Sequence, residues 1–301
     1  MTLQLLDPGL HTLLVDIGRP RTRSLGVPVG GAADRWSLAI GNALVGNPVD
    51  TAALEITLSG PSLRADRELA CVLYGAPFTL TTDRQPLKVG KTFTLAAGEE
   101  LRVAGTQVGM RAYLCVRGGI DAPLILGSRS ALEPLRAGAE LSCQTGAIAS
   151  RFINPKSNWN REPCTLGVIR GAQSEWFSEG EFYHQEYAVS AASNRMGLRL
   201  EGKPNDYPER ELLSEPVCPG TVQVTRKGQC IILGMDAQTI GGYPKIAQVI
   251  SADLDKLGQL RSGDRIDFQQ VSLQEAETRY RQKQAEMMEW LDRLWTTSGS
   301  Q

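Results

Sequence analysis

The segment DAQTIGGYP, residues 236–244, combines a carboxylate, a carboxamide and a hydroxyl group with two adjacent glycines and a tyrosine. Glycine lets a ligand or another chain approach the backbone closely, and proline biases the residue before it toward an extended conformation. The segment therefore predicts either a ledge that presents polar groups to a ligand or an ordinary tight turn capped by its acid. Its candidate site residues are Asp236, Gln238, Thr239, Gly241, Gly242 and Tyr243.

Three arginines beside or near glycines are candidates for binding an anion. Arg19 lies in the long irregular stretch DIGRPRTRSLGVPVGGAAD, Arg117 lies in VRGG, and Arg195 lies in SNRMG. A guanidinium group binds a carboxylate or a phosphate through two parallel hydrogen bonds. A solvated surface position is the alternative, and an arginine beside a glycine is more often a surface residue than a ligand clamp.

Two further acids are candidates for acid–base chemistry beside Asp236 and Tyr243. Glu55 interrupts the apolar run of ALEITLSGP, which favours a carboxylate on the solvated face of a strand; the alternative is burial with a partner that would shift its pKa. Glu215 in LLSEPV either acts as a base or caps a turn. His184 in FYHQEY is expected to be a half-buried strand residue rather than a catalytic base.

Known nucleotide and metal motifs are missing from the sequence. The segment VGKTF, residues 89–93, is similar to the end of a P-loop, but Gln85 stands where that loop requires glycine. His11 and His184 are the only histidines, which argues against a zinc site of the H-E-x-x-H type and against a Ser–His–Asp triad. The chain also has no G-x-S-x-G motif and no Met-Lys-Met segment that would carry covalent biotin. We expect no metal site and no self-contained nucleotide site.

The balance of charges argues against nucleic acid and membrane partners. Lys plus Arg number 32 and Asp plus Glu number 33, so the net charge of −1 offers no attraction to polyanions. No apolar run approaches the roughly 18 residues of a membrane span, and the N-terminus does not have the pattern of a signal peptide. Six scattered cysteines without a CxxC pair suit reduced thiols. These features predict a cytoplasmic protein.

Short strands separated by glycine turns supply the framework for these residues. Segments such as CVLYGAPFTLTTD and RAYLCVRGG have the composition of strands, so the fold is expected to be mainly β with a few helices. One helix is predicted over residues 34–46 with Asp34 as its N-cap. A second is predicted over residues 272–295, where Ser272 and Glu275 form a capping box.

A repeated pattern bears on the number of domains. The pattern Leu-x-x-Gly-x-x-apolar-x-apolar occurs at residues 95–103, 135–143 and 260–268, and the last two copies each follow a Gly-Gly pair. The repeat indicates two related β-rich halves, although 31 glycines also make chance matches easy. The expected organisation is a first half over residues 1–152, a linker over 153–163, a second half over 164–271 and a final helix over 272–296.

A set of segments in a fixed order carries a family resemblance. They are DIGRPRTRSLGVPVGGAAD, NALVGNPVDTAALEITLSGP, RGGI with LGSRS, SNRMGLRLEG, LLSE and DAQTIGGYPKIAQVISADLDKLGQLRSGDRIDF. Together they resemble the carboxyltransferase subdomain A/B family, which includes the C subunit of 5-oxoprolinase, allophanate hydrolase subunit 2 and KipA-like proteins. The resemblance covers residues 3–285. It implies two tandem cyclophilin-like β-barrel halves plus a C-terminal helix, in agreement with the repeat.

The resemblance also implies an activity and partners. It predicts a subunit that is inactive alone and acts with a KipI-like B subunit and with an A subunit in ATP-dependent opening of 5-oxoproline to L-glutamate, with ATP and Mg²⁺ at the assembled complex. One alternative is the carboxyltransferase half of a urea amidolyase, where biotin takes part without being attached to this chain. Another is a KipA-like regulatory protein that binds a KipI-like histidine kinase inhibitor. A prolyl isomerase rests on fold analogy alone.

The site expected from this resemblance is a groove for a small cyclic amide or carboxylate. Arginines and backbone N–H groups would face the developing negative charge, with Asp236, Glu55 and Glu215 as acid–base candidates. The chain departs from the family pattern at several positions, which bears on the substrate rather than on the fold. The groove residues are Arg19, Arg117, Arg195, Gln238, Thr239, Gly241, Gly242 and Tyr243, and the departures are Val15, Arg21, Thr225, Arg226, Cys230 and Ile240.

Overall fold

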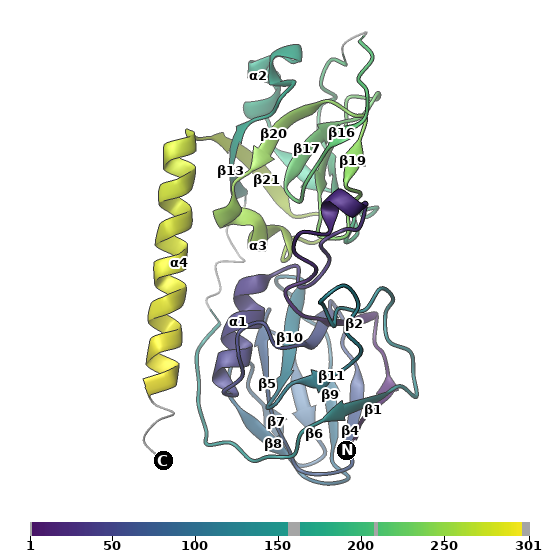
Figure 1. Cartoon of the computed structure of the whole chain (residues 1–301), viewed down its shortest axis with the longest axis vertical. Coiled ribbons are helices and arrows are strands. Elements are labelled where there is room, and N and C mark those ends of the chain that lie inside the picture. Colours follow the sequence, from purple (N-terminus) through teal and green to yellow (C-terminus); the bar gives the residue numbers. More distant parts are fainter. Residues whose placement is uncertain (1, 156–162, 208–209, 297–301) are drawn as a thin grey trace. The chain divides into compact units, whose positions relative to one another are not determined.

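The computed structural model of the chain describes residues 2–155, 163–207 and 210–296 (Figure 1). Strands predominate in these residues and four α-helices accompany them, so the mainly β fold predicted from the sequence is confirmed. The chain divides into two compact units: unit 1 comprises residues 1–19, 30–160 and 287–301, and unit 2 comprises residues 20–29 and 161–286. The linker expected over residues 153–163 lies mostly outside the described residues.

Unit 1 is built on two antiparallel sheets. The seven-stranded sheet has the order β11-β12-β1-β4-β9-β6-β7, and the five-stranded sheet has the order β2-β3-β10-β5-β8. The strands are β1 (Thr2–Asp7), β2 (His11–Val15), β3 (Ala53–Thr57), β4 (Ser62–Ala65), β5 (Leu69–Gly75), β6 (Leu80–Thr82), β7 (Pro86–Leu87), β8 (Phe93–Leu95), β9 (Glu100–Val103), β10 (Arg111–Val116), β11 (Ile120–Asp121) and β12 (Glu140–Cys143).

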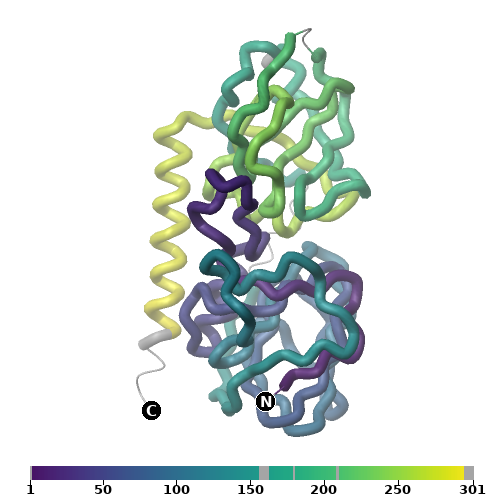
Figure 2. The backbone as a smooth tube through the Cα atoms, turned by 45° about the vertical axis from the view of Figure 1, so that its right-hand side comes forward, coloured from purple at the N-terminus to yellow at the C-terminus, as the bar shows by residue number. Residues whose placement is uncertain are grey.

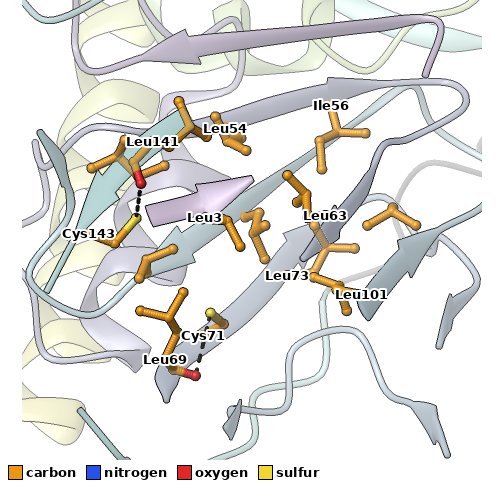
Figure 3. Packing of buried hydrophobic residues seen from close by; sticks show 14 of the residues in the cluster. Leu3, Leu54, Ile56, Leu63, Leu69, Cys71, Leu73, Leu101, Leu141 and Cys143 are labelled. Atoms are coloured by element: carbon orange, nitrogen blue, oxygen red, sulfur yellow. Dashed lines mark hydrogen bonds between the residues drawn. The ribbon is translucent and has the colours of Figure 1, made fainter. Parts of the chain in front are cut away.

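The five-stranded sheet is buried on both faces, as β5 illustrates. Leu69, Cys71 and Leu73 alternate along β5 and join the core shared with the seven-stranded sheet, whereas Val72 and Tyr74 join a second core on the opposite face. Strand side chains alternate between faces, so such a strand must be apolar at almost every position. Figure 3 shows the first core, in which Leu54, Leu69 and Leu73 lie near Leu3, Leu63 and Leu101.

Helix α1 (Arg35–Leu44) covers the second face of the five-stranded sheet and packs on β5 and β10. The carboxylate of Asp34 accepts a hydrogen bond from the backbone N–H of Ser37 at 3.0 Å, which confirms the predicted N-cap. The helix begins where its first unpaired N–H groups find that acceptor.

Helix α4 (Leu273–Thr296) is one continuous helix, drawn in yellow in Figure 2. Ser272 caps its start, because the N–H of Glu275 donates to Oγ of Ser272 at 3.1 Å, which is one of the two hydrogen bonds of the predicted capping box. The residues up to 286 belong to unit 2 and those from 287 belong to unit 1. Leu291 and Leu294 are buried in the core that covers α1 in unit 1.

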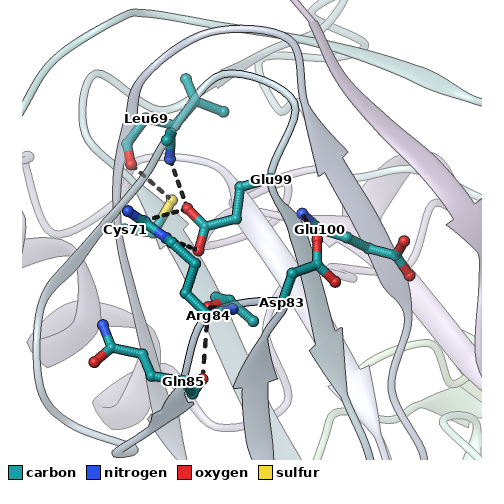
Figure 4. A network of polar contacts seen from close by, with 9 residues as sticks. Leu69, Cys71, Asp83, Arg84, Gln85, Glu99 and Glu100 are labelled. Carbon is teal, nitrogen blue, oxygen red and sulfur yellow. Dashed lines mark hydrogen bonds and ion pairs between the residues drawn. The ribbon is translucent and has the colours of Figure 1, made fainter.

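Two acids at the start of β9 hold the turn between β6 and β7 (Figure 4). Nε of Arg84 donates to Glu99 at 2.7 Å, and the N–H of Glu100 donates to Asp83 at 3.1 Å. Burial would raise the pKa of Glu99, but the hydrogen bonds from Arg84 and the N–H of Ala96 outweigh it and lower that pKa. These charges therefore stabilise a loop of unit 1, and none of them is a predicted site residue.

Unit 2 is a closed barrel with the strand order β13-β20-β17-β18-β15-β14-β21, in which β21 returns to pair in parallel with β13. A separate two-stranded ribbon joins β16 to β19. The strands are β13 (Cys164–Arg170), β14 (Tyr187–Val189), β15 (Gly197–Glu201), β16 (Glu215–Pro216), β17 (Thr221–Val224), β18 (Cys230–Leu233), β19 (Ile240–Gly241), β20 (Lys245–Val249) and β21 (Arg265–Gln270).

Five short helices accompany this barrel in the described residues of unit 2. They are η1 (Arg23–Leu25), η3 (Ser174–Trp176), α2 (Glu179–Tyr183), η4 (Ser251–Asp253) and α3 (Leu254–Leu257). Phe182 of α2 stacks on Phe268 of β21 at 4.7 Å between ring centroids, which fixes α2 to the core. The strand expected around His184 is wrong, because this residue follows α2, is exposed, and lies with its Nδ1 3.1 Å from the carbonyl of Gly180.

Arg21 occupies a backbone conformation that suits glycine. Its φ is 69°, in the left-handed region where a side chain costs about 1 kcal/mol. Arg21 is one of the positions at which the chain departs from the family pattern, and a glycine would adopt this conformation without that cost.

Candidate functional site

The DAQTIGGYP segment forms one side of the short ribbon of unit 2. Glu215 of β16 pairs in antiparallel register with Gly241 of β19, and the N–H of Val217 donates to the carbonyl of Thr239 at 2.9 Å. Lys245, at the start of β20, forms an ion pair with the carboxylate of Glu215. The ribbon therefore brings the glycine pair, a cation and an acid together.

A buried glutamine, Gln173, holds both members of this ion pair. Its backbone N–H donates to the carbonyl of Lys245 at 3.1 Å, and its Oε1 accepts from the N–H of Lys245 at 3.1 Å. Its Nε2 donates to Oε2 of Glu215 at 3.3 Å. The arrangement follows from the barrel, since β13 and β20 are antiparallel neighbours and Gln173 lies just beyond the end of β13.

The carboxylate of Glu215 is held in its ionised form. The hydrogen bond from Lys245 lowers its pKa, its partial desolvation opposes this, and the charge of Lys245 and the amide of Gln173 lower it further. Glu215 is therefore an ion-paired acid rather than a base with a raised pKa. Sequence reasoning missed Gln173, which no motif marks, and Lys245, whose only signal is its place directly after Tyr-Pro.

Gly241 is required by its contact with Gln223. Gln223 is buried on β17, and its Nε2 donates to the carbonyl of Tyr243 at 3.3 Å. A Cβ atom on Gly241 would lie 2.7 Å from that Nε2, whereas the nearest atom to a Cβ on Gly242 would be Oγ of Ser214 at 3.4 Å. A side chain at position 241 would therefore have to displace the Gln223 amide, whereas one at position 242 would meet only ordinary van der Waals contacts.

Arg195 and Asp236 form a second cluster in unit 2. The guanidinium group binds the carboxylate through two hydrogen bonds, at 2.6 Å from Nε and 3.0 Å from Nη2. The N–H of Asp236 also donates to the carbonyl of Arg195 at 3.2 Å. Two predicted site residues are therefore paired with each other, and an anionic ligand would have to share this arginine with Asp236. Gln238 is exposed and Thr239 is buried.

Arg19, in unit 1, is buried and binds the protein's own backbone. Its Nε donates to the carbonyl of Ile125 at 3.1 Å and its Nη2 donates to the carbonyl of Ser130 at 2.6 Å. It is neither solvated nor aimed at solvent, so it supports the loop that contains these carbonyls. Arg117, also in unit 1, is exposed and donates to the carbonyl of Ala147 at 2.8 Å.

Glu55 is fully buried, so the solvated position favoured by the sequence is wrong. Nε of Arg111 lies 3.2 Å from Oε1 of Glu55, and the hydroxyl of Tyr113 donates to Oε2 at 2.8 Å. The N–H of Ala33 donates to the same oxygen at 2.8 Å, and the N–H of Asp34 donates to the tyrosine hydroxyl at 2.8 Å. The network joins β3 and β10 to the start of α1.

Among the residues that the structure describes, no three His, Cys, Asp or Glu side chains are grouped to hold a metal ion. Within the same part of the chain, no helix has the length and apolar character that a bilayer crossing requires. The candidate site of unit 2 therefore comprises two charge clusters, Glu215–Lys245 and Arg195–Asp236, with Gly241, Gly242 and Tyr243 beside the first.

Comparisons with known proteins give the family context. The sequence model of the carboxyltransferase domain, subdomain A and B, matches residues 25–270. The C subunits of 5-oxoprolinase from Haemophilus influenzae and Escherichia coli are 34% and 35% identical to this chain, over 91% of it and 93% of their own lengths. The crystal structure of the Kluyveromyces lactis urea carboxylase superposes with a TM-score of 0.87 at 27% identity, over 96% of this chain and 29% of that one.

The two neighbouring glycines should respond differently to alanine. Gly241→Ala forces the Gln223 amide to move and should lower the free energy of unfolding by about 1–3 kcal/mol. Gly242→Ala, the matched control, should stay within about 0.5 kcal/mol of the wild type. Urea denaturation of both variants measures the difference, and equal effects would contradict the contact described for Gly241.

Asp16 should make the stability of unit 1 depend on pH. Burial raises the pKa of this acid, but hydrogen bonds from Ser128, Ser130 and the N–H groups of Arg129 and Gly18 outweigh it, so the pKa lies below its ordinary value. The stabilisation is complete above the unfolded-state pKa of about 3.9 and is lost as pH falls through the lower folded-state pKa.

Asp16→Asn should therefore lower the free energy of unfolding by about 1–3 kcal/mol near neutral pH, and the difference should shrink below about pH 4. Urea denaturation at a series of pH values measures it. Asp7→Asn is the control, since Asp7 is exposed and accepts one hydrogen bond from the N–H of Gly9. A wild-type advantage that is constant down to the lowest pH would be evidence against this role.

Proposed function

The chain belongs to the carboxyltransferase domain, subdomain A and B family, as its motifs predicted, and from that membership we propose that it is one component of an ATP-dependent 5-oxoprolinase. The observation that carries the proposal is the match to the C subunits of two bacterial 5-oxoprolinases, which spans 91% of this chain and 93% of each relative at 34–35% identity. The complex would open the lactam of 5-oxoproline to give L-glutamate in the cytoplasm, where the free thiols of this chain would stay reduced.

The partners in this proposal are a KipI-like B subunit and an A subunit. ATP and Mg²⁺ would bind at the assembled complex rather than at the VGKTF segment of this chain. In that segment the N–H of Gly90 donates to the carbonyl of Leu73 at 2.8 Å, and a Cβ on Gly90 would lie 2.1 Å from the carbonyl oxygen of Ile153. Its backbone is thus engaged in packing, which supports a nucleotide site elsewhere.

The residues of unit 2 suit the handling of anions. Opening a lactam places negative charge on the carbonyl oxygen in the transition state, and coupling to ATP would pass through an acyl-phosphate-like species that also carries negative charge. Preorganised cations and N–H donors are the groups that stabilise such charge. We assign this role to Arg195, with the Tyr243 hydroxyl as a further donor, and we assign Glu55 and Arg19 to structural roles because they are buried and paired within unit 1.

A urea carboxylase-type carboxyltransferase half is the second candidate, favoured by the superposition on the Kluyveromyces lactis enzyme. In that reaction biotin would arrive on another polypeptide or another part of a longer one. The lower sequence identity of this match places it second. The regulatory role, binding of a KipI-like kinase inhibitor, would use the same fold without catalysis.

The three purified subunits, mixed with ATP, Mg²⁺ and 5-oxoproline, should release L-glutamate, and omission of this chain or of ATP should abolish the release. A glutamate assay measures the rate. Carboxylation of urea from a carboxybiotin carrier, without glutamate release, would establish the second candidate instead. Tight capture of a kinase inhibitor with neither activity would establish the regulatory role.

Tyr243→Phe should lower kcat/KM of the assembled complex at least about tenfold, the loss expected when one transition-state donor is removed. Its side chain is 40% exposed, so the melting temperature of the protein should not change. Tyr280→Phe is the matched control, since Tyr280 is 44% exposed on α4 and should retain the wild-type rate. Equal rates for the two variants would remove Tyr243 from the site.

A further inference from the structure

Two hydrogen-bond donors of unit 2 converge on one carboxylate at the ribbon. Nζ of Lys245 and Nε2 of Gln173 both bind Oε2 of Glu215. Gln173 is fixed by two further hydrogen bonds to the backbone of Lys245, so the amide and the ammonium group keep their relative positions. The pair of donors is arranged as a receptor for a carboxylate oxygen.

The three groups differ in their access to water. The Lys245 side chain is 12% exposed and Gln173 is 7% exposed, whereas the Glu215 side chain is 38% exposed on a strand of only two residues. An enclosed ammonium group is costly without an anion beside it. The carboxylate of Glu215, in contrast, is accessible, so it can move into water at small cost once another anion takes its place beside Lys245. The acid can leave the site while the cation cannot.

We propose that Lys245 and Gln173 form a binding site for the carboxylate of a small ligand, and that Glu215 occupies this site in the free protein and leaves it when the ligand binds. The ligand class is a small organic monocarboxylate. 5-Oxoproline belongs to that class, and to this extent the inference rests on the proposed function.

The surroundings of the pair fit an exchange of one carboxylate for another. Gly241 lies opposite Glu215 in the ribbon, and the next residue, Gly242, is exposed and has no side chain, which leaves its backbone open to a ligand. Gln223 anchors the carbonyl of Tyr243 and thereby holds the adjacent turn. The Lys245 hydrogen bond keeps the pKa of Glu215 below its ordinary value, so near neutral pH the internal competitor is charged like the ligand.

Occupation of the site by Glu215 in the free protein has a measurable consequence. A ligand that binds only when Glu215 has moved away binds with an apparent affinity reduced by the fraction of molecules in that state. If that fraction is at most about one in ten, removing the Glu215 carboxylate should tighten carboxylate binding at least about tenfold. The increase should depend on Lys245, because the ammonium group supplies the charge of the site.

The experiment is a ligand-observed NMR titration of the purified full-length protein with sodium acetate and with L-5-oxoproline. The variants are Glu215→Ala, Glu215→Gln, and Glu215→Ala combined with Lys245→Met. Glu186→Ala is the matched control, because Glu186 is also in unit 2, its side chain is 43% exposed, and it is paired with an exposed arginine, Arg265. Thermal melting of each variant verifies that it is folded.

The expected result is at least tenfold tighter binding of one or both probes to Glu215→Ala, unchanged binding to Glu186→Ala, and no tightening in the variant that also carries Lys245→Met. Glu215→Gln should bind at least about threefold more tightly than the wild type, since it removes the charge and keeps the shape. It is the deciding variant if Glu215→Ala does not fold.

Three outcomes would overturn the inference: equal binding to the wild type and the Glu215 variants, tightening that survives Lys245→Met, or the same tightening in Glu186→Ala. Its failure is separable from that of the proposed function. A complex that releases glutamate while Glu215→Ala gains no affinity refutes only the carboxylate site. Acetate binding to Glu215→Ala without glutamate release from the assembled complex refutes only the proposed activity.

Discussion

A charge that is removed from water needs an opposite charge or a set of hydrogen-bond donors beside it, and this constraint decides which residues of the chain remain available to a ligand. In unit 1 it joins Glu55 to Arg111 and ties Arg19 to two backbone carbonyls. These groups are enclosed, so both partners are committed to the fold. In unit 2 the enclosed cations Arg195 and Lys245 are each paired with a more accessible acid, and that difference in exposure makes unit 2 the place for exchangeable chemistry.

The order of the strands places an enclosed cation beside an accessible acid in unit 2. The closed barrel sets β13 beside β20, which brings Gln173 to Lys245, and the separate ribbon carries Glu215 to the same point from another part of the chain. The five-stranded sheet of unit 1 is instead covered on one face by a second sheet and on the other by the apolar sides of helices. Both units are rich in β-strands. They differ in whether the acid paired with an enclosed cation is itself enclosed, as Glu55 is in unit 1, or accessible to solvent, as in unit 2.

The sequence predicted those features that depend on neighbours in the chain. The Asp34 and Ser272 caps could be predicted because each acts within one helical turn. The ordered motifs were sufficient to identify the family. Features that depend on partners distant in the sequence could not be predicted. The burial of Glu55 requires Arg111, and the fixed position of Lys245 requires Gln173, which no local pattern connects to it. The sequence likewise did not predict that residues 20–29 belong to unit 2, or that Arg21 has a left-handed backbone conformation.

The contact between the ribbon glycine and the barrel glutamine has an evolutionary consequence. A larger residue at position 241 must displace the amide of Gln223 or be matched by a shorter side chain at position 223, and either change releases the carbonyl of Tyr243. We therefore expect substitutions at the two positions to be energetically coupled in descendants of this fold. A lineage in which one of them had drifted while the other stayed fixed would have had to rebuild the turn between them.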